Sequence, residues 1–238
     1  MLFTLATSAR AQLVESPGAA ESLLKRMEAA YTALASYSDV TAVKYRNPDG
    51  SDRSTVEFKM WFARPARFRA DAQTTRPDGS APKREVMWTD GQSARSWSTG
   101  KAVTNLTKVQ LAGSGMFGTY AYHIPTLLEP SYAGKKRLHE LGSPTLAGEE
   151  AIDGIECYRV RGQFFTDPYE LWIAKRDLLV RKLVASYAGH QMEEIHRNVE
   201  VNAPLAGDVF KFAPENEATV PPPATPSPTP ASTKKAGR

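Results

Sequence analysis

Strict alternation of apolar and polar residues, in short stretches separated by turn residues, is the feature that most constrains how this 238-residue chain folds. The alternation is clearest where one side of an extended strand would carry Val56, Phe58, Met60 and Phe62. The same pattern predicts strands at 39–45, 55–63, 67–73, 85–89, 93–98, 156–165, 169–174, 178–187 and 192–201. Consecutive strands joined by short turns, with no helix between them, indicate an antiparallel sheet.

Two segments of different character accompany the strands. Residues 17–34 place apolar side chains at helical spacing, and Ser16 and Pro17 are typical of a helix start, so we expect one amphipathic helix there. Residues 105–146 are apolar but are interrupted by glycine and proline. We interpret this second segment as short helices that cross one face of the sheet.

The two ends of the chain differ in composition from its middle. The apolar start reaches Ala9, Arg10 and Ala11, a pattern typical of signal-peptidase cleavage, and residues 1–11 are interpreted as the remnant of a secretion signal. Residues 215–238 are rich in proline and contain no aromatic residue, which predicts a disordered tail. A single domain remains at 12–214, and no apolar run is long enough for a transmembrane segment.

The charge of the chain argues against a nucleic-acid partner. Its formal net charge is +4, but four of its 30 basic residues and two of its 26 acidic residues lie in the terminal segments. The middle is therefore nearly neutral, whereas binding a phosphate backbone requires a one-signed basic patch. Arg64, Arg67 and Arg69 lie among aromatic residues, and we interpret them as the solvent-facing side of a strand. A basic rim that meets anionic lipid head groups is the alternative.

The histidines do not complete a metal or catalytic motif. His190, Glu194 and His196 share one side of a predicted strand, and zinc accepts such ligands. The opposite side of that strand is apolar, so we expect the histidine side to face solvent. His123 and His139 lie in irregular segments without a partner at a fixed spacing.

Other motifs are equally incomplete. The single cysteine, Cys157, lies within a predicted strand and excludes an intrachain disulfide. Residues 113–118 match the dinucleotide pattern G-x-G-x-x-G, but the βαβ unit that this pattern requires is missing. We therefore expect no enzyme, no catalytic residue, no metal and no cofactor.

Several strand and turn motifs occur together in a recognisable order. They are Arg-Pro-x-Arg-Phe-Arg at 64–69, Trp-x-Asp-Gly at 88–91, the run 149–157, Trp-Ile at 172–173 and Pro-Leu-x-x-Asp-Val-Phe-x-Phe at 204–212. In these motifs the chain resembles the periplasmic lipoprotein-localisation superfamily, typified by LolA and LolB, and in particular its uncharacterised secreted branch. None of the motifs is catalytic, so the resemblance supports a shared fold better than it supports a shared activity.

The resemblance implies an α+β fold, in which a strongly curved antiparallel sheet forms an incomplete β-barrel. An N-terminal helix and short helices would cover its concave face. The implied function is a secreted, periplasmic, non-enzymatic carrier or binding protein for the acyl chains of lipids or lipoproteins in the bacterial envelope. The alternative is an envelope sensor or interaction protein that binds a protein partner with the half-barrel and uses the proline-rich tail as a tether.

A lipid or an acylated lipoprotein would then be the partner, enclosed by large apolar side chains. Segment 116–128 would act as a lid over this ligand. The same large side chains would equally serve a packed core. Our candidates for cavity wall or lid are Trp61, Phe62, Phe68, Trp88, Trp97, Phe117 and Trp172.

Overall fold

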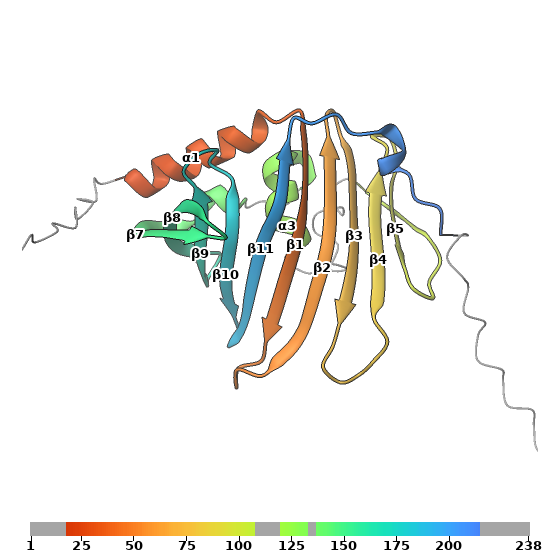
Figure 1. Ribbon diagram of the computed structural model, residues 1–238, viewed down its shortest axis with the longest axis horizontal. Coiled ribbons are helices and arrows are strands. Elements are labelled where there is room, and N and C mark those ends of the chain that lie inside the picture. The colour runs from red at the N-terminus through yellow and green to blue at the C-terminus, as the bar shows by residue number, and fades with distance from the viewer. Residues whose placement is uncertain (1–17, 108–119, 133–136, 215–238) are drawn as a thin grey trace, which may run out of the picture.

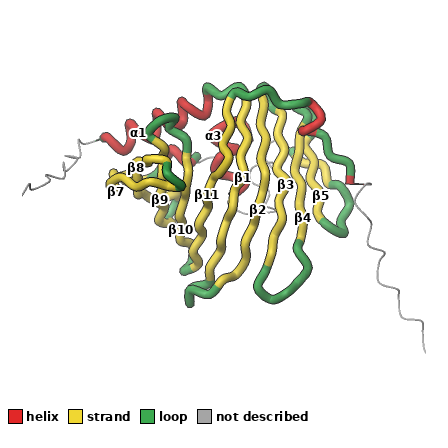
Figure 2. Tube along the Cα trace, in the orientation of Figure 1, coloured by secondary structure: helices red, strands yellow, loops and turns green. Residues whose placement is uncertain are grey.

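The computed structural model describes residues 18–107, 120–132 and 137–214 (Figure 1). Within these residues, eleven strands form one antiparallel sheet in the order β6-β5-β4-β3-β2-β1-β11-β10-β9-β8-β7. The first and last strands of the chain, β1 and β11, pair at its centre. The sheet curves but does not close into a barrel (Figure 2). The predicted α+β fold with an incomplete barrel is therefore confirmed.

The strands are β1 (Ser36–Arg46), β2 (Asp52–Ala63), β3 (Arg67–Thr75), β4 (Lys83–Thr89), β5 (Ala94–Ser98), β6 (Thr104–Leu106), β7 (Gly142–Ile152), β8 (Ile155–Phe164), β9 (Asp167–Ala174), β10 (Val180–Tyr187) and β11 (His190–Val201). The helices are α1 (Ala19–Thr32) and α3 (Tyr120–Leu128), with 3-10 turns η1 (Pro130–Tyr132), η2 (Leu138–Glu140) and η3 (Gly207–Phe210).

All nine predicted strands are present, and the two edge strands were missed. Strand β7 carries mostly exposed side chains, contains Pro144 and Gly148, and shifts its register twice against β8, so its sequence lacks alternation. Strand β6 has only three residues. The short helices expected in the crossing segment are α3, η1 and η2. The interpreted signal remnant, the glycine pattern at 113–118 and the proline-rich tail lie outside the described residues.

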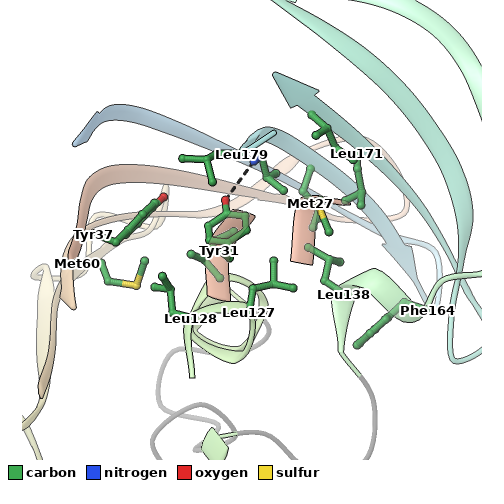
Figure 3. Close-up of a cluster of buried hydrophobic side chains, with 14 of the residues drawn as sticks. Met27, Tyr31, Tyr37, Met60, Leu127, Leu128, Leu138, Phe164, Leu171 and Leu179 are labelled. Carbon is green, nitrogen blue, oxygen red and sulfur yellow. Dashed lines mark hydrogen bonds between the residues drawn. The ribbon is translucent and has the colours of Figure 1, made fainter. Parts of the chain in front are cut away.

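One face of the sheet carries the helices and the main core, and we call it the helix-covered face. Helix α1 buries Leu23, Leu24, Met27 and Tyr31, the same spacing that predicted it, and packs against β7, η2 and α3. Figure 3 shows Met27 and Tyr31 of this helix close to Leu127 and Leu128 of α3 and to Leu171 of the sheet. The hydroxyl of Tyr31 accepts a hydrogen bond of 3.1 Å from the amide of Val180, drawn as a dashed line.

Arg64, in the turn after β2, connects the ends of both helices. Its Nε donates a hydrogen bond to the carbonyl of Leu34 at 2.9 Å. Its Nη2 donates to the carbonyls of Thr32 at 2.7 Å and Leu128 at 2.8 Å. Carbonyls at the end of a helix lack an intrahelical partner. One guanidinium therefore satisfies groups at the ends of α1 and α3 and holds the two helices together.

Candidate functional site

A cavity of about 700 Å³ opens at the end of the sheet where the β1–β2, β3–β4 and β10–β11 connections lie, the lower edge in Figure 1. Its lining comes from β1 to β4 on one side and from β9 to β11 on the other. The curvature of the sheet brings these two sides to face each other. A volume of this size lies within the range of small-molecule binding sites.

The lining of the cavity is mostly apolar inside, where the carboxylate of Glu85 is also buried, and polar at the mouth. Val56, Ala185 and Met192 are buried and belong to the main core as well as to the cavity. The more exposed lining residues include Arg53, Arg76, Lys83, Asp167, Tyr187 and His190. This division suits a molecule that places an apolar part inside and a polar part at the mouth.

A series of buried polar groups begins at the cavity wall and continues inward along β11 and β1. The Tyr169 hydroxyl lies 3.2 Å from Nε2 of His123, whose Nδ1 lies 3.0 Å from Oε2 of Glu194. Oε1 of Glu194 lies 3.1 Å from Nε2 of His196, an ion-pair contact with poor hydrogen-bond angles. Nδ1 of His196 then lies 2.7 Å from Oδ2 of Asp39. We call His123, Glu194, His196 and Asp39 the buried charge chain.

Ion pairing keeps Glu194 and His196, in the middle of the buried charge chain, ionised although both are buried. Burial alone would raise the pKa of Glu194, but the charge of His123 and the contacts with both histidines outweigh it and lower the pKa to about 2. Burial alone would lower the pKa of His196, but its contacts with Asp39 and Glu194 raise it to about 9. At neutral pH, Glu194 is therefore an anion and His196 a cation.

Hydroxyl groups complete the surroundings of Asp39. Tyr37 and Thr41, on the same strand, donate hydrogen bonds to its Oδ2 at 2.8 and 3.0 Å. The cost of removing a carboxylate from water is partly offset by such donors. Oδ1 of Asp39, Oε1 of Glu194 and Nε2 of His196 make no hydrogen bond to another described residue, so the helix-covered face holds an only partly satisfied polar network within an apolar core.

The prediction that the histidine side of β11 faces solvent was wrong. Glu194 and His196 are buried on the helix-covered face, with exposures of 0% and 3%. Their burial is tolerated because β1 and α3 bring complementary groups from distant parts of the chain. His190, on the same side of β11, lines the mouth of the cavity. No group of three or more His, Cys, Asp or Glu residues among those described could hold a metal ion.

His123 is the residue of the candidate site that the sequence indicated least. The sequence offered it no partner, yet it lies on α3 and connects that helix to both β11 and the cavity wall. A buried histidine on an apolar helix, separated by 71 positions from its carboxylate partner, leaves no local signal. His139 lies 3.4 Å from a carboxylate oxygen of Glu28 on α1.

The seven predicted wall or lid residues do not form one site. Phe62 and Phe68 are buried in the main core on the helix-covered face. The strand register places the four tryptophans on the opposite side, which we call the outer face: Trp61, Trp88, Trp97 and Trp172. Phe117 lies outside the described residues. None of the six described candidates lines the cavity, and their role in ligand binding stays a prediction.

Trp172 belongs to a small second cluster on the outer face, together with the buried Cys157. Its Nε1 donates a hydrogen bond of 3.0 Å to Glu150. The cationic groups of Arg159 and Lys182 lie 5.3 and 4.9 Å from its ring centre. Trp172 is therefore covered by charged side chains, and its neighbours explain its 4% exposure.

A larger aromatic cluster lies over β3, β4 and β5 on the outer face. The ring of Phe212, after η3, lies 5.1 Å from Trp88 and 5.4 Å from Trp97, measured between ring centres. The guanidinium groups of Arg69 and Arg84 lie 5.4 and 5.6 Å from the same ring. The end of the described chain is thus fastened to the outer face by aromatic and cation–π contacts.

Asp71 joins the two arginines of this cluster. Its carboxylate lies 2.7 Å from Nη2 of Arg69 and 2.8 Å from Nε of Arg84. Burial opposes ionisation, but hydrogen bonds from both arginines outweigh it and lower the pKa of Asp71. We call Phe212, Trp88, Trp97, Arg69, Arg84 and Asp71 the outer cluster. Arg67 stacks on Phe210 at 5.0 Å, so neither it nor Arg69 forms the basic rim considered from the sequence.

No described helix is long and apolar enough to cross a membrane. No protein-family model matches the sequence, and no curated protein matches it.

Solved structures share the architecture at low sequence identity. LprF from Mycobacterium bovis is 14% identical, with 81% of this chain and 96% of that chain covered and a TM-score of 0.51. The lipoprotein LppX from Mycobacterium tuberculosis is 15% identical, with 81% and 100% covered and a TM-score of 0.48. The LolA superfamily protein NE2245 from Nitrosomonas europaea is 12% identical, with 81% and 97% covered and a TM-score of 0.40. The open eleven-stranded sheet with its helix-covered face shares its fold with LprF, and the structures that it resembles include a LolA superfamily protein.

Proposed function

We propose that this protein is a non-enzymatic carrier or binding protein for the acyl chains of lipids or acylated lipoproteins in the periplasm of the bacterial envelope. The observation that supports the proposal is the cavity of about 700 Å³ at the open end of the curved sheet. Its floor of Val56, Ala185 and Met192 is continuous with the main core, so an acyl chain would replace water against an apolar surface.

The energy available from such a cavity is sufficient for useful affinity. Transfer of one methylene group from water into an apolar site contributes about 0.8 kcal/mol. Roughly ten buried methylenes would contribute about 8 kcal/mol, part of which is lost to immobilisation of the chain and of the protein. A ligand of this length would bind with an affinity that calorimetry measures directly.

The surrounding structure keeps the cavity in shape before a ligand arrives. Helix α3, the described part of the predicted lid, is held at one end by Arg64 and at its middle by His123. The buried charge chain meets the cavity wall at Tyr169. A preformed wall lowers the cost of binding, because fewer groups are ordered when the ligand enters.

The decisive test fills the cavity floor with a larger side chain. Ala185 is 5% exposed and lines the cavity, so Ala185→Phe should remove volume and weaken displacement of a fluorescent fatty acid by about tenfold or more. Ala151→Phe on the exposed part of β7 is the matched control and should bind as the unchanged protein does. Native mass spectrometry of the gently purified protein should show bound lipid. Reproducible absence of lipid and of probe binding would refute the proposal.

A protein-binding sensor is distinguished by the part of the chain that it needs. A carrier lacking residues 215–238 should retain its lipid, because the described residues that line the cavity lie between Tyr45 and Met192. Partner capture that requires the tail, combined with an empty cavity, would support the sensor instead.

A further inference from the structure

We infer that the ligand of the cavity is an anionic amphiphile whose head group binds between Arg53 and Arg76 at the mouth. The inference rests on the proposed function, because it names the ligand class of the same cavity. Both arginines are exposed and line the mouth. Arg53 belongs to β2 and Arg76 directly follows the neighbouring strand β3, so the two residues present their guanidinium groups on one side of the opening.

A β-bulge brings Arg53 to the cavity. Tyr45 pairs with Ser54 and Arg46 pairs with Asp52, so Arg53 has no residue opposite it on β1. Simple alternation would turn Arg53 to the outer face, since Ser54 and Val56 point to the cavity. A bulge redirects the side chain of the extra residue, and here it allows Arg53 to line the mouth.

Arg76 reaches the mouth by ordinary strand alternation. It follows the last residue of β3 and shares the side of Thr74, which also lines the cavity. Asp78, in the same loop, lies within electrostatic range of Arg76. Among the described residues, no carboxylate lies within ion-pair distance of Arg53 or Arg76. By contrast, Lys83 is bound to Glu85 at 2.5 Å and is not available in the same way.

Two guanidinium groups without a close carboxylate favour an anion with several oxygen atoms. Guanidinium donates parallel hydrogen bonds to carboxylate or phosphate oxygens, which fits either kind of head group. Asp167, on β9, is the acidic residue across the mouth and would repel an anion from that side. The head group is therefore expected on the β2–β3 side of the opening.

The neighbouring side chains indicate an amphiphile and not a free anion. Beyond the mouth the lining includes the buried apolar side chains of Val56 and Met192, and the buried carboxylate of Glu85 there is paired with Lys83. Tyr45 and Tyr187 also line the mouth, and Tyr187 is 69% exposed although its ring is large and apolar. Tyrosine rings suit a boundary where one end of a ligand is apolar and the other is hydrated.

The test compares three probes by isothermal titration calorimetry below the critical micelle concentration. Palmitoyl lysophosphatidylglycerol supplies an anionic head, palmitoyl lysophosphatidylcholine supplies the same chain with no net charge, and inorganic phosphate supplies the anion alone. The anionic lipid should bind about tenfold more tightly than the zwitterionic one at low ionic strength, and added salt should reduce that difference. Inorganic phosphate should not bind measurably at the same concentrations.

The double variant Arg53→Gln, Arg76→Gln should bind both lipids with the affinity of the zwitterionic one. The matched control, Lys59→Gln, Arg95→Gln, removes two exposed charges from the outer face and should keep the preference. Equal affinity of the unchanged protein for both lipids would overturn the inference and leave the proposed function standing. If the Arg53, Arg76 variant still prefers the anionic lipid, the head group does not bind at these two arginines. Tight binding of inorganic phosphate would show that the ligand is a free anion and not an amphiphile. Absence of binding by either lipid would remove the proposed function itself.

Discussion

Two charge clusters on opposite faces of the same sheet use similar ion pairs in very different surroundings. In the buried charge chain, the side chains of Glu194 and His196 are 0% and 1% exposed. In the outer cluster, Arg69, Asp71 and Arg84 keep exposures of 16%, 18% and 35%. Water can replace a lost partner in the second cluster but not in the first. The same chemical contact is therefore a requirement for folding on one face and a modest addition on the other.

The comparison is tested most severely by Glu194→Leu. The change removes the anion between two histidines and leaves His196 buried with less compensation, so we expect a loss of about 3–5 kcal/mol in the free energy of unfolding. Urea denaturation followed by far-ultraviolet circular dichroism measures it. A variant in which all four residues of the buried charge chain are replaced by leucine should lose less, because no unpaired charge remains. If Glu194→Leu lowers the free energy of unfolding by less than about 1 kcal/mol, the buried charge chain contributes no more than the solvent-exposed outer cluster.

The pH dependence of stability separates the two faces next. The pKa of Glu194 is lowered to about 2, so its contribution is complete above the ordinary value near 4.5 and is lost as the pH falls toward 2. The pKa of His196 is raised to about 9, so its contribution is complete below 6.5 and is lost as the pH rises through 9. The buried charge chain should therefore stabilise the fold most between about pH 4.5 and 6.5, by on the order of 3 kcal/mol for each group.

Denaturant midpoints measured from pH 2 to 10 provide the check. The difference between the unchanged protein and Glu194→Leu isolates the buried chain, because other titrating groups, including Asp71, occur in both. That difference should shrink at both ends of the range. A constant difference would mean that the chain does not hold its charges as the structure indicates.

Phe212→Ala tests the aromatic part of the outer cluster. Loss of the ring removes contacts with Trp88 and Trp97 and uncovers the two arginines, so we expect a loss of about 1–2 kcal/mol. Hydrogen exchange of residues 207–214 should increase while that of β11 stays unchanged. Equal acceleration in both regions would show that the outer cluster supports the whole fold.

The smallest effect is expected for Asp71→Asn. It removes the carboxylate between Arg69 and Arg84, where solvent still reaches all three side chains, so the loss should not exceed about 1 kcal/mol. Thermal denaturation at low and at high salt measures it, and high salt should reduce the difference further. A loss comparable to that of Glu194→Leu would remove the distinction between the two faces.

Alternation and turn residues were enough to predict most strands of the sheet, because the apolar and polar residues alternate within each of those strands. Val56, Phe58 and Met60 identify β2 without reference to any other strand. Strand β7 was not predicted because most of its side chains are exposed and because Pro144 and Gly148 interrupt its pattern. Local patterns therefore predict the interior of the sheet better than its edges.

The site was harder to predict because its parts meet only after folding. The assignment of His196 to solvent followed from the apolar residues on the opposite side of its strand, yet Asp39, 157 positions away, supplies the compensation that burial of His196 requires. The cavity depends on the curvature of the sheet and on a bulge at Arg53, and neither has a sequence signature. The size of the tryptophans predicted them as cavity residues, whereas arginine and lysine side chains cover Trp61 and Trp172 on the outer face.

The position of the four tryptophans determines which optical signal can report on the cavity. All four lie on the outer face, so their emission should respond to detachment of Phe212 but remain almost unchanged when a ligand enters. The chromophores near the cavity are Tyr45, Tyr169 and Tyr187. Tyrosine absorbance, or the emission of one new tryptophan introduced by Ala188→Trp, would therefore report ligand entry. The emission of the four native tryptophans would report changes at the outer face, so the two faces of the sheet can be followed by separate optical signals.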